Sequence, residues 1–349
     1  MDPYDRGMEA EGGDEPRATR APTIYDVAQA AGVAASTVSR TFARPGRVNS
    51  QTAERVRAAA AAIGYRANPV AQALSTARSR MIAVLVSDLA NPIYAELLRG
   101  AQVAASAAGY GVLVEDTRED AAIERETAER ILPMVEGVLL ASSRMSDAAI
   151  RGVAKQRPLV VMNRGLADVP CVVADEQRGT RRAVEHLREA GHRDLVYVGG
   201  PDASWPNGAR WRAFSDACHE LDLTGRRIGP FEPTFAGGFE AALALGGSRA
   251  SGVLVFNALM AVGVIRGLQQ AGLRVPEDVS VVGFDDVLIG QIVSPALTTV
   301  STPLQAMGAT GLRNLLALVN GARSRGEPVV VPARLVVRES SGTVAARAG

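Results

Sequence analysis

Near its start the chain has apolar positions at the three- and four-residue spacing of helices. The first helix is expected to begin at Thr23, which forms a capping box with the acid three residues later, and to end at Gly32. A second helix is expected over about 35–42, and a third after Asn49, a capping residue, with helical apolar spacing up to Ile63. Three short helices with a tight turn between the first two predict a small helical domain.

From residue 81 onward the pattern changes to short, continuous runs of Val, Ile and Leu. The runs expected to be strands are 81–87, 110–115, 136–141, 158–162, 194–199, 252–256 and 278–283. Such runs, alternating with helical segments, are typical of parallel strands covered on both faces. Hydrophobic residues make up 47% of the chain and aromatic residues only 4%, which suits helix-on-sheet layers of small aliphatic side chains. The predicted fold class is α/β, with doubly wound lobes whose ligand sites lie at the carboxyl ends of strands.

Charge is divided unevenly along the chain, although the net charge is only +1. Residues 1–16 hold six acids and one arginine, a net charge of −5. Residues 17–80 hold ten arginines against Asp26 and Glu54, a net charge of +8, and the remaining residues sum to −2. Because DNA responds to local charge, the basic segment indicates a nucleic-acid-binding module.

Other features disfavour several classes of protein. The sequence has no GxGxxG, Walker or GxSxG motif and its three histidines lack metal-ligand spacing, so we expect no enzyme, no cofactor and no metal. Two cysteines, Cys171 and Cys218, are too few for a disulfide framework and fit a reducing compartment. The start does not resemble a signal peptide and no apolar run is long enough to cross a membrane, so the expected location is cytoplasmic, with no membrane partner.

Several motifs closely resemble those of the lactose-repressor (LacI/GalR) family. Residues 23–40 read TIYDVAQAAGVAASTVSR, residues 48–56 read VNSQTAERV and residues 68–74 read NPVAQAL. Further matches are NPIY at 91–94 and GFDD at 283–286. The resemblance covers essentially residues 22–340. It implies a helix-turn-helix DNA-binding head, a hinge helix and a two-lobed core like that of periplasmic sugar-binding proteins.

The resemblance also implies a division of the chain. The expected segments are a disordered tail 1–20, a helix-turn-helix domain 21–66, a hinge helix 67–79, an effector-binding core 80–341 and a short tail 342–349. Within the core, lobe 1 is expected over about 80–175 and 302–330, and lobe 2 over about 176–301 and 331–341. An exported binding protein with the same core is the alternative, but the basic head argues against it.

In a helix-turn-helix head the second helix enters the major groove and its first residues meet base edges. The residues expected to contact DNA are Thr23, Tyr25, Ala34, Ala35, Ser36, Thr37, Ser39, Arg40, Arg47, Asn49 and Thr52 in the head, with Asn68 and Leu74 in the hinge. Arg40 is the expected guanine contact. Ala34 and Ala35 predict apolar contact with thymine methyl groups. For Tyr25 two interpretations stay open, a DNA contact or packing in the small core.

The hinge residue Leu74 has the most specific mechanistic role that the resemblance implies. In the family the matching leucine of each subunit wedges into the minor groove at the operator centre and kinks the duplex. The alternative is that Leu74 packs on the core lobe. A wedge from each of two subunits predicts a homodimer on double-stranded DNA with a palindromic operator.

By resemblance, effector contacts come from strand ends that face the cleft between the lobes. The expected residues are Ser87, Asp88, Ile93, Tyr94, Ser142, Asn163, Arg164, Arg210, Phe231, Asn257 and Asp285. Asp285 has an alternative role in capping the following helix. Asn163 and Ala258 stand where relatives often have Asp, which lowers the negative charge of the site.

Paired donors and acceptors in an apolar slot suit a hydroxyl-rich ligand, so a neutral sugar is the expected effector. Nucleosides, purines and sugar phosphates remain alternatives. The working hypothesis is induction, in which ligand binding closes the cleft and releases the operator. The opposite sign, with ligand strengthening DNA binding, stays open.

Overall fold

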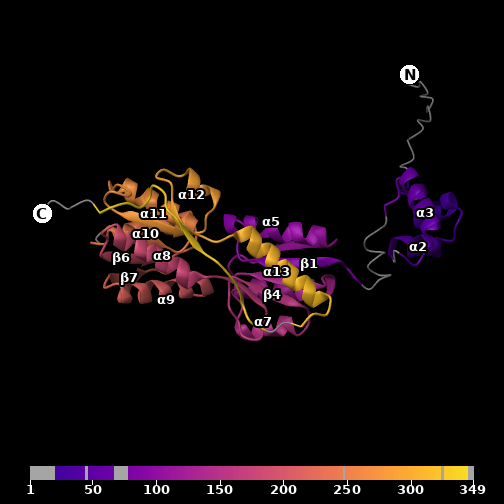
Figure 1. Cartoon of the computed structure of the whole chain (residues 1–349), viewed down its shortest axis with the longest axis horizontal. Coiled ribbons are helices and arrows are strands. Elements are labelled where there is room, and N and C mark those ends of the chain that lie inside the picture. Colours follow the sequence, from indigo (N-terminus) through magenta and orange to yellow (C-terminus); the bar gives the residue numbers. More distant parts are fainter. Residues whose placement is uncertain (1–19, 44–45, 67–77, 247, 324–325, 345–349) are drawn as a thin grey trace, which may run out of the picture. The chain divides into compact units, whose positions relative to one another are not determined.

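The computed structural model describes residues 20–43, 46–66, 78–246, 248–323 and 326–344 (Figure 1). The chain separates into two compact units, Met1–Ser79 and Arg80–Gly349, here called the head and the core. The predicted tail 1–20, except its last residue, lies outside the described residues, as do 67–77 of the predicted hinge helix with Asn68 and Leu74. The tail prediction for 345–349 is outside them too.

The head consists of α1 (Ile24–Ala31), α2 (Ala35–Ala43) and α3 (Ser50–Ala62), as the apolar spacing predicts. At the start of α1, the Asp26 carboxylate accepts hydrogen bonds from the backbone N–H of Thr23 at 2.6 Å and from its hydroxyl at 2.7 Å. Gly32 ends α1 at φ 62°, a conformation that glycine adopts without strain. Fully buried valines, one from each helix, form the centre of this small core: Val27, Val38 and Val56.

The core contains two lobes, each built on one sheet. Lobe 1 holds β1 (Met81–Val86), α5 (Pro92–Ala107), β2 (Gly111–Asp116), α6 (Ala121–Ile131), η1 (Leu132–Met134), β3 (Gly137–Ala141), α7 (Asp147–Ala154), β4 (Leu159–Met162), β5 (Cys171–Ala174), α13 (Leu304–Val319) and β11 (Val329–Val331). Lobe 2 holds α8 (Glu176–Glu189), β6 (Asp194–Val198), α9 (Trp205–Glu220), β7 (Thr224–Ile228), α10 (Phe235–Leu245), β8 (Gly252–Val255), α11 (Ala258–Gln270), β9 (Ser280–Phe284), α12 (Leu288–Ile292), β10 (Thr298–Ser301) and β12 (Arg334–Val336).

The two sheets have matching orders, β11-β5-β4-β3-β1-β2 in lobe 1 and β12-β10-β9-β8-β6-β7 in lobe 2. Their strand pairs are parallel, apart from the antiparallel pairing of β12 with β10. The chain passes between the sheets near residue 175 and again at 302–303 and 332–333, so α13 packs beside α5 of lobe 1 (Figure 1). Parallel strands in both lobes place their carboxyl ends, and the loops that follow, at one edge of each sheet.

All seven strands expected from apolar runs are present, within two residues at each end. The strands that the pattern did not reveal are short or polar: β5, β7, β10, β11 and β12. β7 reads TGRRI and lies at a sheet edge, where burial does not demand apolar residues. β2 was expected to be covered on both faces, but it too is an edge strand and is only partly buried.

Glycines bring pairs of helices into close contact in both lobes. A Cβ atom on Gly308 of α13 would lie 2.0 Å from the carbonyl oxygen of Leu97 in α5. In lobe 2, a Cβ on Gly238 of α10 would lie 2.0 Å from the carbonyl oxygen of Met260 in α11. Backbone-to-backbone packing of this kind leaves no room for a side chain, so each helix pair is held at a fixed separation.

Candidate functional site

A cavity in the core is lined almost entirely by residues that follow the carboxyl ends of strands. Its lining residues are Asn91, Ile93, Tyr94, Glu119, Ser142, Arg144, Asn163, Ser204, Pro206, Arg210, Pro233, Phe256, Asn257 and Asp285. Both lobes contribute, and the space left between the two walls is about 20 Å³. That is room for about one water molecule, whereas pockets that hold small organic ligands measure roughly 300–1,000 Å³. A larger ligand therefore requires the two walls to separate.

Seven of the effector residues expected from the sequence line this cavity: Ile93, Tyr94, Ser142, Asn163, Arg210, Asn257 and Asp285. The other four do not. The Ser87 hydroxyl donates to the carbonyl oxygen of Ser142 at 2.7 Å, and Asp88 accepts from the N–H of Ala90 at 2.8 Å. Arg164 donates to the carbonyl oxygens of two loop residues and pairs with Asp147 at 2.5 Å, while Phe231 packs on the hydrophobic core.

In the lobe 1 wall, one arginine is held by a carboxylate and by backbone. Arg144 lies in the loop after β3, and its Nε donates to Glu119 at 2.6 Å while Nη1 donates to the Ser142 carbonyl at 2.9 Å. Behind it, the buried Glu124 accepts from the backbone N–H groups of Arg144 and Met145 at 2.7 and 3.2 Å. Burial raises the pKa of Glu124 against the opposing effect of these hydrogen bonds. The sequence analysis did not identify Arg144 or Glu119.

Lobe 1 also contributes a ring and an amide to the wall. Tyr94, in the first turn of α5, is buried, and burial raises the pKa of its phenol. The Asn163 amide donates to the Ser142 hydroxyl at 3.3 Å. Both of these residues have left-handed backbones, with φ of 62° for Ser142 and 55° for Asn163. Non-glycine residues held in this region concentrate at functional sites, where the surrounding structure imposes the conformation.

In the lobe 2 wall, one arginine faces two carboxylates. Arg210 of α9 donates from Nε and Nη2 to the two oxygens of Glu176 at 2.8 and 2.9 Å, and from Nη1 to the Phe256 carbonyl at 2.6 Å. Asp285 lies 3.7 Å from Nη2, and the guanidinium lies 4.1 Å from the ring centroid of Phe284. Burial disfavours the charge on Arg210, but Glu176 and then Asp285 outweigh it and raise the arginine pKa.

The second carboxylate of this group, Asp285, is buried, and burial disfavours its charged form. Burial raises the pKa of Asp285 to about 6, although Arg210 opposes the shift. Asp285 is 6% exposed and has a left-handed backbone with φ of 71°. Its 3.7 Å separation from Arg210 exceeds hydrogen-bond length, so it keeps acceptor capacity toward the cavity.

Both ends of the Asn257 side-chain amide form a hydrogen bond within the protein itself. Its oxygen accepts from the N–H of Met260 at 2.8 Å and so caps α11, and its amide donates to the Pro233 carbonyl at 2.9 Å. Ser204 has the opposite situation. It precedes α9, is 2% exposed, lines the cavity, and has a hydroxyl with no hydrogen-bond partner among the described residues. Sequence patterns could not reveal Ser204, because an N-cap serine normally bonds its own helix.

In the head, none of the eleven described DNA-contact residues is buried. Tyr25 is 72% exposed, so the alternative that it packs in the small core is wrong. On α2, the exposed Arg40 folds back along its own helix, with Nε and Nη2 each 3.2 Å from an oxygen of Ser36. Asn49 caps α3, because its side chain accepts from the N–H of Gln51 at 2.9 Å. These side chains are available at the surface, as a contact with DNA requires.

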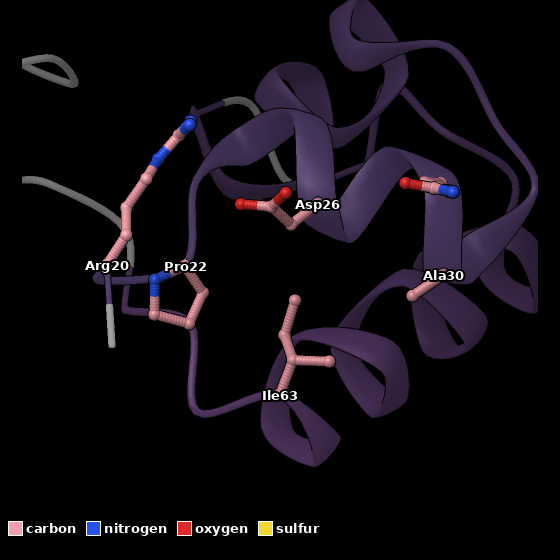
Figure 2. Close-up of a pocket in the computed structure, with 6 residues that line it drawn as sticks. Arg20, Pro22, Asp26, Ala30 and Ile63 are labelled. Atoms are coloured by element: carbon pink, nitrogen blue, oxygen red, sulfur yellow. The ribbon is translucent and has the colours of Figure 1, made fainter. Parts of the chain in front are cut away.

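The head has a surface hollow that is separate from these residues. Figure 2 shows Pro22, Asp26 and Ile63 around it, with Arg20 at one end and Ala30 at the other. Gln29 is the remaining lining residue, so α2 contributes none. The hollow therefore lies away from the predicted recognition helix.

The described part of the chain contains neither a metal-binding cluster nor a helix suited to cross a membrane. No group of three or more His, Cys, Asp or Glu side chains in it is placed to hold a metal ion. None of its helices combines the length and apolar character that spanning a bilayer requires.

Known protein families match both the head and the core. The family model for bacterial regulatory proteins of the lacI family matches residues 23–68, and the model for a periplasmic binding protein-like domain matches residues 184–341. The transcriptional regulator DegA of Bacillus subtilis is 30% identical over 329 residues, covering 91% of this chain and 98% of DegA. The chain belongs to the LacI family. Membership makes it a transcriptional regulator and not an enzyme, in agreement with the sequence prediction.

Solved structures of LacI-family proteins agree with the fold. The lac repressor dimer bound to operator and the anti-inducer ONPF has a TM-score of 0.83 at 27% identity, covering 93% of this chain and all of that one. A LacI-family regulator from Enterococcus faecium with bound ribose has a TM-score of 0.69 at 28% identity, covering 76% of this chain and all of that one. The predicted fold class, a helix-turn-helix head with a two-lobed α/β core, is confirmed.

Proposed function

We propose that the protein binds a palindromic operator as a homodimer and represses transcription until a neutral, hydroxyl-bearing small molecule, most simply a sugar, enters the cleft between its lobes. The observation that carries the proposal is the cavity of the core, where polar side chains from both lobes converge at strand ends around a closed space. This is the usual position for a ligand in doubly wound folds. The lac repressor bound to operator and the regulator with bound ribose support the DNA and sugar parts.

The chemistry of the cavity suits hydroxyl groups. Asp285 retains acceptor capacity, the Ser204 hydroxyl can donate and accept, and Arg210 has N–H groups beyond its three hydrogen bonds to Glu176 and Phe256. Buried polar groups without partners are costly, so a ligand that satisfies them gains affinity. Tyr94 and Phe256 supply an apolar surface beside these groups.

Coupling to DNA would follow from a change in the angle between the lobes. Trp205 begins α9 in lobe 2, yet its ring packs against the hydrophobic cluster of lobe 1, and a Cβ on Gly165 would lie 3.2 Å from it. Trp205 lies between Ser204 and Pro206, which line the cavity, so this contact between the lobes adjoins the ligand site. A ligand that favours one angle shifts DNA affinity by its differential binding, typically about 1–3 kcal/mol.

The DNA part is tested by selecting preferred duplexes from random sequence with the full-length protein, followed by anisotropy titrations. We expect a palindromic consensus and an affinity that falls with salt, at a logarithmic slope of roughly −0.9 per phosphate neutralised. Arg40→Ala should lose discrimination at one symmetric base pair, by about 1–3 kcal/mol. Arg55→Ala, an exposed arginine of α3 outside the predicted contacts, is the charge-matched control. Binding without sequence preference would contradict the proposal.

The effector part is tested by thermal melts of the full-length protein with a panel of neutral sugars and nucleosides, because a cleft ligand stabilises by mass action. A sugar that raises the melting temperature should then lower operator affinity in the anisotropy assay. A ligand that tightens operator binding would reverse the sign of regulation and make the protein a corepressed one. If only nucleosides stabilise the protein, nucleosides replace sugars as the proposed effector class.

A further inference from the structure

The N–H groups along one edge of Arg210 are already occupied by another residue of the protein. A guanidinium presents parallel N–H groups that match the two oxygens of a carboxylate or phosphate. In this protein Glu176, the first residue of α8, takes both Nε and Nη2 at 2.8 and 2.9 Å. The side chains of Arg210 and Glu176 are 8% and 6% exposed. An anionic ligand that approached Arg210 would meet a cation that is already paired inside the protein.

The remaining directions around Arg210 are restricted as well. Nη1 donates to the Phe256 carbonyl at 2.6 Å, and the carboxylate of Asp285 lies 3.7 Å from Nη2. The rings of Phe284 and Phe256 lie 4.1 and 5.4 Å from the guanidinium carbon. A second carboxylate or a phosphate cannot replace Glu176 without leaving that acid buried and unpaired, which is costly in a low-dielectric site.

The charged groups of the whole cavity also disfavour an anionic ligand. Its two arginines, Arg144 and Arg210, face four carboxylates that line it or lie directly behind it: Glu119, Glu124, Glu176 and Asp285. Because the acids outnumber the bases, the cavity repels a further negative charge. Hydroxyl groups are not repelled, since they donate to the carboxylates and accept from the N–H groups that remain.

We infer that Glu176 is a specificity-determining residue, a built-in counter-ion that closes Arg210 to anionic effectors, so that the cleft accepts neutral hydroxyl-bearing molecules and rejects their phosphorylated or carboxylated forms. The inference rests on the proposed function in taking this cleft as the effector site. It removes sugar phosphates from the possible effectors and leaves neutral sugars and nucleosides.

Inorganic phosphate is the probe that tests this inference, because it reports on Arg210 whatever the natural effector is. The full-length wild type and Glu176→Gln are melted in increasing phosphate, with sodium chloride at matched ionic strength as reference. Glutamine keeps the size of the side chain and removes its charge. We expect the variant to show saturable stabilisation, with an apparent affinity for phosphate at least about tenfold above that of the wild type.

Two control variants assign the effect to the pair. Glu185→Gln removes a carboxylate from the same helix that pairs with Arg181 and Arg182 at the surface, and it should behave as the wild type. Adding Arg210→Gln to Glu176→Gln should abolish the phosphate response. This control distinguishes phosphate binding in the cleft from phosphate binding to the arginines of the head. A Glu176→Gln protein that folds, by circular dichroism, and gains no phosphate response overturns the inference.

The wild type alone provides a test that does not depend on the folding of a variant. Saturable phosphate binding to the wild type that disappears in Arg210→Gln would show that Arg210 is open to anions and would also overturn the inference. The proposed function fails separately. If no neutral sugar or nucleoside stabilises the wild type while Glu176→Gln gains phosphate binding, the blocking role of Glu176 stands and the effector assignment falls.

Discussion

The two walls of the cleft stabilise their charged side chains in different ways. Each wall holds one buried arginine and two carboxylates. In lobe 1 the second acid, Glu124, is satisfied by two backbone N–H groups, and Arg144 is held by Glu119 and a carbonyl. In lobe 2 the carboxylate of the second acid, Asp285, has the ion contact with Arg210 at 3.7 Å and no hydrogen bond from another described residue. Backbone amides therefore balance the lobe 1 wall, whereas the lobe 2 wall keeps acceptor capacity for a ligand.

The largest difference is expected from removing each arginine. Arg210→Met leaves Glu176 and Asp285 buried without a cation, so the free energy of unfolding of the core should fall by about 3–5 kcal/mol. Arg144→Met should cost less, about 1–3 kcal/mol, because Glu124 keeps its amide donors and Glu119 is partly exposed. Urea denaturation of the full-length protein measures both. Equal losses would contradict the distinction between the walls.

Asp285 should make the stability of lobe 2 depend on pH. Its pKa is raised by burial to about 6 in the folded state, against an ordinary value of 3.8. A raised pKa contributes stability that is present at pH below the ordinary value and is lost as the pH rises through about 6. Asp285→Asn should remove this dependence and stabilise the protein at pH 8 by about 1–3 kcal/mol. Melting profiles from pH 5 to 8 test this, and parallel profiles for wild type and variant would refute it.

Acid should affect lobe 2 more than lobe 1, because all three histidines of the chain belong to it. His192 is buried, with Nδ1 2.8 Å from the Ser251 hydroxyl and Nε2 3.1 Å from the Gly342 carbonyl. Burial lowers the pKa of His192 and of His186 below the ordinary 6.5. A lowered histidine pKa means that stability present above about pH 6.5 is lost as the pH falls through the folded-state value.

This acid dependence is checked by hydrogen exchange, which reports on each lobe separately. In an Asp285→Asn background, which removes the opposing pH dependence of that carboxyl, protection at pH 5 compared with pH 7 should fall in β6 and β8 before it falls in β1 and β3. His219 is exposed and serves as the control site: His219→Gln should leave the pattern unchanged, and His192→Gln should weaken it. Uniform loss of protection in both lobes would contradict the prediction.

The smallest effect concerns a single hydroxyl in each wall. The Ser204 hydroxyl has no hydrogen-bond partner among the residues that the structure describes, so Ser204→Ala should leave stability unchanged or raise it by less than about 1 kcal/mol while weakening effector affinity. Ser142→Ala loses the hydrogen bond from Asn163 and should be mildly destabilising. Thr180→Val, which removes another unpartnered buried hydroxyl that does not line the cavity, is the matched control and should leave effector affinity unchanged. Calorimetric titration of a stabilising sugar separates the two serines.

Much of the architecture could be predicted from local patterns. Helical spacing and capping residues place the three head helices, because burial and capping act within a few residues along the chain. Apolar runs place the central strands of both sheets. Several strands at sheet edges and near the end of the chain were not predicted. β7 is polar because it is exposed, and β10 reads TTVS, with its two threonine hydroxyls donating to backbone carbonyls.

The sequence predicted site residues only where a polar or family-motif residue follows a recognisable strand. Seven of the eleven expected effector residues line the cavity, yet Glu119, Arg144 and Ser204 were missed, and the role of Glu176 was invisible. These residues have no distinctive neighbours in the sequence. Their importance comes from partners far along the chain, such as the 34 residues that separate Glu176 from Arg210. The expected residues themselves stay predictions until ligand binding is measured.

Periodicity, charge and motifs are properties of neighbouring residues, so the basic helical head, the α/β core of parallel strands and membership of a family of regulators follow from the amino-acid sequence. Which charges meet follows from the folded chain alone. Desolvation and pairing depend on distance in space, so the joining of Glu176, Arg210 and Asp285 in one buried group, and the cavity chemistry that results, required the folded chain.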